Sequence, residues 1–96
     1  MITHVCMFKI KEENHDAVLK EALKLAEPLK QLTEAIQGEV VVNDTKADDS
    51  NYDICLLFDF ENYDKLDAYQ KHPTHVKFKE YIVAHMSNRA CIDYKH

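Results

Sequence analysis

The residues best suited to chemistry in this sequence lie in the segment YQKHPTH, residues 69–75. It places Tyr69, His72 and His75 around Pro73. A neutral imidazole can accept a proton near pH 7, because its reference pKa is about 6.5. A tyrosine hydroxyl can hydrogen-bond to a substrate carbonyl and stabilise the enolate charge that develops there. The segment therefore offers either a proton-transfer pair or only the turn between two helices.

Each of these residues also has a purely structural interpretation. The residue before proline avoids helical backbone angles, so His72 is expected to be the turn or N-cap residue before a helix. His75 fits a half-buried imidazole satisfied by a backbone carbonyl, and Tyr69 fits core packing with its hydroxyl at the rim. A metal site at His72 and His75 would need a third ligand, and the sequence offers none nearby. We expect neither a metal nor a cofactor.

A short helix over residues 63–71 is expected to carry Tyr69. Asn62 is a candidate N-cap for it, because its side chain can accept from an unpaired N–H of the first turn. Leu66 lies three residues before Tyr69, so the two side chains share one side of the helix. Tyr69 is therefore expected to face inward.

A second helix is expected over residues 73–86. Pro73 suits its first turn, where the missing N–H would have no partner in any case. His75 precedes Phe78 by three residues and Ile82 by seven, so it lies on their inward stripe. The turn at His72 thus lets residues on both of its sides point the same way.

The rest of the chain predicts an α+β fold of one domain, residues 1–96. For a helix expected over residues 15–36, Asn14 is a candidate N-cap and Pro28 predicts a break around 24–28. Gly38 can supply the left-handed residue that ends this helix. Alternating and helical patterns predict strands over 2–10, 39–45, 52–60 and 88–95 and a helix over 15–36. This order is βαββαβ, the ferredoxin-like arrangement of one antiparallel sheet with helices on one face.

The two strands expected in the centre of this sheet are apolar on both faces. Val5 and Met7 lie on the second face of one strand, and Cys55 and Leu57 on that of the other. One layer of helices covers only one face, and large exposed apolar patches are rare on monomers. We therefore expect a homodimer whose sheets pack face to face into a barrel. The alternative is a tolerated exposed patch.

His4 is the third candidate site residue. It shares one strand face with Cys6 and Phe8. If the helices cover that face, His4, Tyr69 and His75 converge in the space between sheet and helices. This convergence depends on the fold, because the spacing alone does not require it.

Composition excludes several classes of protein. The net charge of −5 argues against a general nucleic-acid-binding protein, which would need a basic stripe to neutralise phosphates. The longest apolar run, residues 54–58, is far shorter than a membrane span, and the first residues show no signal peptide. The odd number of cysteines (Cys6, Cys55 and Cys91) and the lack of a CxxC motif favour buried, reduced thiols in a cytoplasmic protein.

Over residues 3–94 the sequence resembles the stress-responsive A/B barrel family, also called dimeric α/β barrel or Dabb proteins. YQKHPTHV, preceded by YDICLLFDFEN, is similar to the core motif of that family. THVCMFKIK resembles its opening strand, and CIDY its closing strand. The resemblance implies a dimeric ferredoxin-like fold.

The resemblance also implies roles for the candidate residues. Some members of the family are polyketide cyclases, in which the motif serves ring closure. Carried over to this chain, His75 would be the base that removes a proton alpha to a carbonyl. Tyr69 would hold the carbonyl or enolate oxygen, and His4 would orient the substrate.

Three functions remain open at this point. The protein could bind a small, mostly apolar molecule in each protomer, without a reaction. It could be a cofactor-free enzyme that uses His75 and Tyr69 for proton abstraction. It could also be a stress-associated structural protein with no ligand. A pocket lined by His4, Tyr69 and His75 would favour the first two functions, and a filled core the third.

Overall fold

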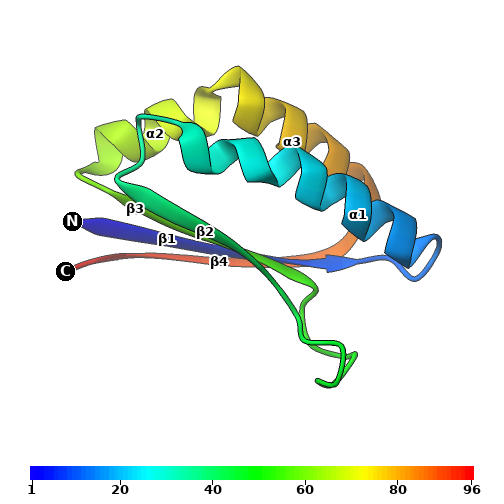
Figure 1. Ribbon diagram of the computed structural model, residues 1–96. Coiled ribbons are helices and arrows are strands. Elements are labelled where there is room, and N and C mark those ends of the chain that lie inside the picture. The colour runs from blue at the N-terminus through cyan, green and yellow to red at the C-terminus, as the bar shows by residue number, and fades with distance from the viewer.

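The computed structural model describes residues 1–96 as one antiparallel sheet of four strands with helices on one face (Figure 1). The elements are β1 (Ile2–Ile10), α1 (His15–Ala26), the 3₁₀ helix η1 (Glu27–Gln31), β2 (Gln37–Val42), β3 (Ile54–Phe60), α2 (Tyr63–Lys71), α3 (Pro73–His85) and β4 (Met86–Lys95). The strand order β2-β3-β1-β4 places β1 and β3 in the centre. The predicted ferredoxin-like α+β fold is confirmed.

The core lies between the sheet and the helices. In β1 and β3 the side chains that face the helices are buried. Most of the side chains that alternate with them, and so point to the other face of the sheet, are only half-buried. Each large apolar side chain removed from water in this way contributes roughly 1.5–3 kcal/mol. The largest fully buried side chains are Tyr69, Phe58, Phe60, Phe78, Ile10, Leu29, Ile54, Leu56 and Ile82. The strand face that carries His4, Cys6 and Phe8 is therefore the one that the helices cover.

The predicted helix over 15–36 is shorter than expected. α1 ends at Ala26, and the chain continues as the 3₁₀ helix η1, which contains Pro28 near its start. The expected break near Pro28 is thus present. Asn14 does occupy the N-cap position, but it has a left-handed φ of 54° and its side chain makes no capping bond. None of the helices has the length and apolar composition needed to cross a membrane.

The role expected for Gly38 was wrong. Gly38 lies inside β2 and has no positive φ. A Cβ built on it would lie 2.1 Å from Cε2 of the Phe58 ring. Glycine is needed there because the aromatic ring of the neighbouring strand packs directly on its backbone. β2 accordingly begins before Gly38 and ends at Val42, earlier than predicted.

The turn between α2 and α3 forms as predicted. Oδ1 of Asn62 accepts a hydrogen bond from the N–H of Lys65, at 3.0 Å, and caps α2. His72 has extended backbone angles, and its Nδ1 accepts from the N–H of Thr74 at 3.1 Å. Pro73 begins α3. His72 and Pro73 are therefore the turn.

The expectation of three buried, reduced cysteines was wrong. A disulfide joins Cys6 to Cys91, and only Cys55 is free. Cys6 of β1 and Cys91 of β4 lie directly opposite each other in the sheet although 85 residues separate them in the sequence. Cys91 is also exposed. The pairing follows from strand register, which cysteine spacing alone cannot show.

The second face of the sheet carries no helix (Figure 1). Val5 and Leu57 are half-buried there in the centre, and Met7 and Cys55 lie beside them. The exposed Ile92 of β4, opposite Val5 in the register, extends this apolar surface toward the sheet edge. We call these residues of β1, β3 and β4 the outer sheet face. The sequence predicts that a second copy of the sheet packs against this surface.

Candidate functional site

The structure brings His4, Tyr69 and His75 together between the sheet and the helices. The ring centroids of Tyr69 and His75 lie 4.8 Å apart, and those of His4 and Tyr69 lie 6.4 Å apart. The residues are 3% (His4), 0% (Tyr69) and 9% (His75) exposed. The geometric convergence expected from the sequence is therefore present.

The α2–α3 turn positions two of these three residues. Tyr69 lies in the last turn of α2 and His75 in the first turn of α3. The extended backbone of His72 between them redirects the chain, so both side chains point toward the sheet. The Tyr69 ring packs against Phe58 and Phe60 of β3, with centroid distances of 5.2 and 4.9 Å. These aromatic contacts fix the ring in the core.

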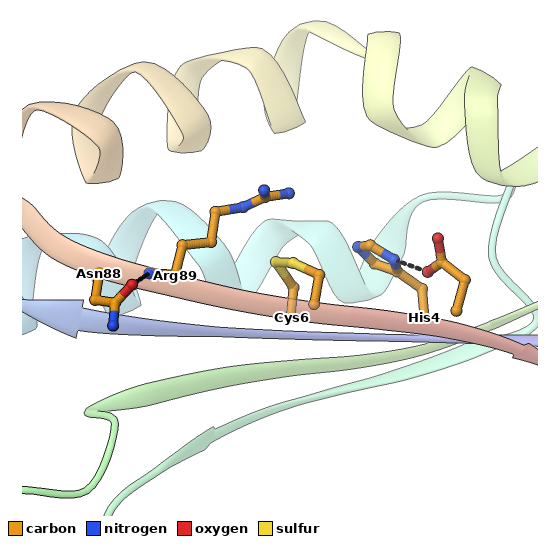
Figure 2. Close-up of a disulfide and its surroundings, with 6 residues drawn as sticks. His4, Cys6, Asn88 and Arg89 are labelled. Atoms are coloured by element: carbon orange, nitrogen blue, oxygen red, sulfur yellow. Dashed lines mark hydrogen bonds and ion pairs between the residues drawn. A yellow bond between two sulfur atoms is a disulfide. The ribbon is translucent and has the colours of Figure 1, made fainter.

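Asp93 of β4 holds the imidazole of His4. The two residues are opposite each other in the register, and His4 Nδ1 is paired with a carboxylate oxygen of Asp93 (Figure 2). This contact fixes the orientation of the imidazole ring and leaves Nε2 on its far side. Sequence reasoning missed Asp93. The alternation of β4 could have indicated it, because Arg89, Cys91 and Asp93 share one strand face.

Two polar atoms of the site are buried without a hydrogen-bond partner. They are the hydroxyl oxygen of Tyr69 and Nδ1 of His75. Nearly all buried polar groups in proteins are paired, and leaving one unpaired costs roughly 1–3 kcal/mol. Both atoms therefore lack a hydrogen-bond partner within the protein.

Burial also fixes the protonation states of these two residues at neutral pH. It raises the pKa of Tyr69 well above its usual value, so the hydroxyl keeps its proton and can donate. Burial is also the main reason why the pKa of His75 falls to about 4, and electrostatic interactions with His4 and Lys79 lower it further. His75 is therefore neutral at pH 7 and has one nitrogen that can accept a hydrogen bond.

The lowered pKa of His75 gives a pH dependence of stability. Between pH 6.5 and about 4 the unfolded chain binds a proton at this residue and the folded chain does not, so stability is complete above pH 6.5 and falls as the pH drops toward 4. The loss is expected to reach about 3 kcal/mol. Urea unfolding of wild type and of His75→Leu at several pH values measures it. Equal pH slopes for the two proteins would contradict a buried neutral His75.

A cavity of about 140 Å³ lies between the sheet and α3, next to these residues. His4 and His75 line it, and Tyr69 lies behind His75, outside the lining. The lining residues are His4, Cys6, Phe8, Leu56, Gln70, His75, Phe78, Lys79, Ile82, Val83 and Arg89. The space is mainly apolar at its base, with polar groups at its rim. The core is therefore not completely filled at this place.

Sequence reasoning missed three polar residues of the cavity, Gln70, Lys79 and Arg89. Lys79 lies four residues after His75 on the same helix, so helical spacing could have indicated it. The register of β4 is needed to place Arg89, which lies opposite Phe8. No group of three His, Cys, Asp or Glu side chains is arranged to hold a metal ion.

A larger hollow of about 930 Å³ lies between the start of α1 and the loop before β3. It is wide open and mostly polar. Its buried carboxylate, Asp53, is already satisfied by the N–H of Ile10 at 2.7 Å and by His15 Nε2 at 2.8 Å. Because no buried polar group there lacks a partner, the smaller cavity is the better candidate.

The sequence model of the family described as "Stress responsive A/B Barrel Domain" matches residues 2–96 of the chain. The match covers both histidines of the cavity, Tyr69 and all four strands. No curated protein matches the chain.

Solved structures share the fold over nearly the whole chain. A protein from Thermobifida fusca, described as a dimeric ferredoxin-like protein of unknown function, is 20% identical with a TM-score of 0.87, over 99% of this chain and 90% of its own. A dimeric protein of ferredoxin-like fold from Bacteroides fragilis is 23% identical with a TM-score of 0.83, over 99% and 95%. A Dabb family protein from Mesorhizobium loti is 23% identical with a TM-score of 0.76, also over 99% and 95%. At these identities the likeness shows the fold alone.

Proposed function

The chain belongs to the stress-responsive A/B barrel family, and on this premise we propose that it binds a small, mostly apolar molecule in the cavity between the sheet and α3. The observation that carries this proposal is the pair of buried, unpartnered polar atoms on Tyr69 and His75 beside that cavity. A stable core without a ligand would be expected to satisfy or exclude them. The purely structural function, which requires a filled core, is therefore the weakest of the three.

The size and lining of the cavity limit the ligand. A cavity of about 150 Å³ lined by apolar side chains can hold one benzene ring. The apolar wall here is made by Phe8 of β1, Leu56 of β3 and Phe78 and Ile82 of α3. A single ring or a short branched chain fits this space. A hydroxyl or carbonyl on it would pair with the unpartnered Nδ1 of His75, which lines the cavity.

The test is a titration with phenol, a ring with one neutral hydroxyl, followed by NMR of the ¹⁵N-labelled imidazoles. The His75 signals are expected to shift saturably. Val83→Trp should weaken binding at least ten-fold, because Val83 lines the cavity yet is 49% exposed and can be enlarged at the rim. Val76→Trp is the matched control, since Val76 is exposed on the same helix and does not line the cavity. Equal binding by both variants would place phenol elsewhere and refute the proposal.

Proton abstraction is a second candidate function, with His75 as base and Tyr69 as donor to the enolate oxygen. The observation in its favour is that Tyr69 is protonated and His75 neutral at pH 7, as the two roles require. A base works best when its pKa is near the operating pH, and about 4 is well below it. The geometry therefore supports binding more strongly than catalysis. Solvent deuterium exchange into the methyl group of acetophenone that survives His75→Ala would exclude this base.

We further propose that the protein is a homodimer that packs its outer sheet faces together. The solved structures from Thermobifida fusca and Bacteroides fragilis, which share this fold, are described as dimeric. Val5, Leu57 and Ile92 form a contiguous apolar surface on the side without helices. A second copy of the same sheet would cover this surface by two-fold symmetry. The cavity lies on the opposite side of the sheet and would stay accessible.

A further inference from the structure

Two cationic side chains lie at the rim of the cavity. Lys79 comes from α3 and Arg89 from β4, and both line the cavity. Figure 2 shows the Arg89 side chain rising from β4 on the side of the helices, on the same side of the sheet as His4 and the disulfide. Neither residue forms an ion pair with a carboxylate of the protein. The two charges are therefore available to a ligand.

Both charges are close enough to affect the buried end of the cavity. Burial is the main cause of the lowered pKa of His75, and the positive charges of Lys79 and Arg89 contribute to it. No aspartate or glutamate lines the cavity. Asp93, which shares a face of β4 with Arg89, is engaged by His4. The protein thus maintains a local positive potential at this rim although its net charge is −5.

The two ends of the cavity differ in what they can accept. At the inner end His75 is neutral, His4 is engaged by Asp93 and the rest of the wall is apolar, so a charged group would lose its hydration there without compensation. At the outer end the guanidinium of Arg89 and the ammonium of Lys79 can both donate to an anion. A ligand that suits both ends carries its charge at the rim and its apolar part inside.

We infer that the ligand is a small monocarboxylate, whose carboxylate is held by Arg89 and Lys79 at the rim while a single ring or short apolar chain occupies the cavity beside His75. This inference rests on the proposed binding function and specifies its ligand class. It assigns Arg89 and Lys79 as residues that determine specificity.

The test compares benzoate with benzamide, which has nearly the same shape and no charge. Isothermal titration with wild-type protein is expected to show at least ten-fold tighter binding of benzoate at low salt, and 0.5 M NaCl should reduce this preference. Arg89→Gln and Lys79→Gln are each expected to weaken benzoate binding about five-fold and to leave benzamide unchanged. Lys77→Gln is the matched control, since Lys77 is exposed on α3 and does not line the cavity.

The outcomes separate this inference from the function on which it rests. If benzamide and benzoate bind equally well in the cavity, or if Lys77→Gln has the same effect as Arg89→Gln, the carboxylate site is wrong and apolar binding stands. If neither compound binds and phenol does not bind either, both proposals fail. A benzoate preference that disappears in the Arg89→Gln/Lys79→Gln double variant supports the assignment.

Discussion

Gly38→Ala is expected to lower the free energy of unfolding by about 3 kcal/mol. The added Cβ would lie 2.1 Å from the Phe58 ring, which is completely buried in the centre of the sheet. Phe58 cannot move away freely, because it packs in turn on Tyr69. Either β2 must separate from β3 or the ring must displace Tyr69. Thermal and urea unfolding measure the loss.

Two further variants test this explanation of Gly38. Glu39→Ala, at the exposed neighbouring position of β2, is expected to change stability by less than about 0.5 kcal/mol. Phe58→Leu removes the ring atoms that the new Cβ would meet, so the effects of Gly38→Ala and Phe58→Leu should not add in the double variant. Additive losses would show that something other than this contact requires glycine.

Leu57→Asp is expected to convert the proposed dimer into monomers and to weaken self-association at least 1,000-fold. Leu57 lies in the centre of the outer sheet face, opposite Val5 in the register. In the proposed dimer a carboxylate at this position would be buried without a partner. Sedimentation velocity over a range of protein concentrations measures the change.

Tyr63→Asp is the matched control for Leu57→Asp. It adds the same charge at an exposed position of α2, on the helical side of the molecule. The control protein is expected to sediment as wild type. A wild-type protein that is monomeric at micromolar concentration, or a Leu57→Asp protein that stays dimeric, would refute the sheet-to-sheet dimer.

The parts of the structure that the sequence could predict depend on local signals. Alternation in β1 and β3 separated the two faces of each strand, because successive side chains of a strand point to opposite sides. Asn62 and Pro73 marked the starts of α2 and α3 through the unpaired N–H groups of a first helical turn. The convergence of Tyr69 and His75 follows from these same signals.

The parts that could not be predicted depend on which strands are neighbours and in what register. The disulfide of Cys6 and the pairing of His4 with Asp93 both require β1 and β4 to lie side by side with that register. Gly38 gave a turn signal, but the Phe58 ring of the adjacent strand decides its role. Arg89 belongs to the cavity for the same non-local reason.

The central claim is that the cavity beside His75 holds a small ring-shaped ligand, and a crystal structure of the protein soaked with 4-bromophenol tests it most directly. The account predicts an anomalous bromine signal between Leu56 and Phe78, with the phenol oxygen within hydrogen-bond distance of His75 Nδ1. A cavity without bromine at saturating 4-bromophenol, with Tyr69 and His75 paired to other protein atoms, would contradict it.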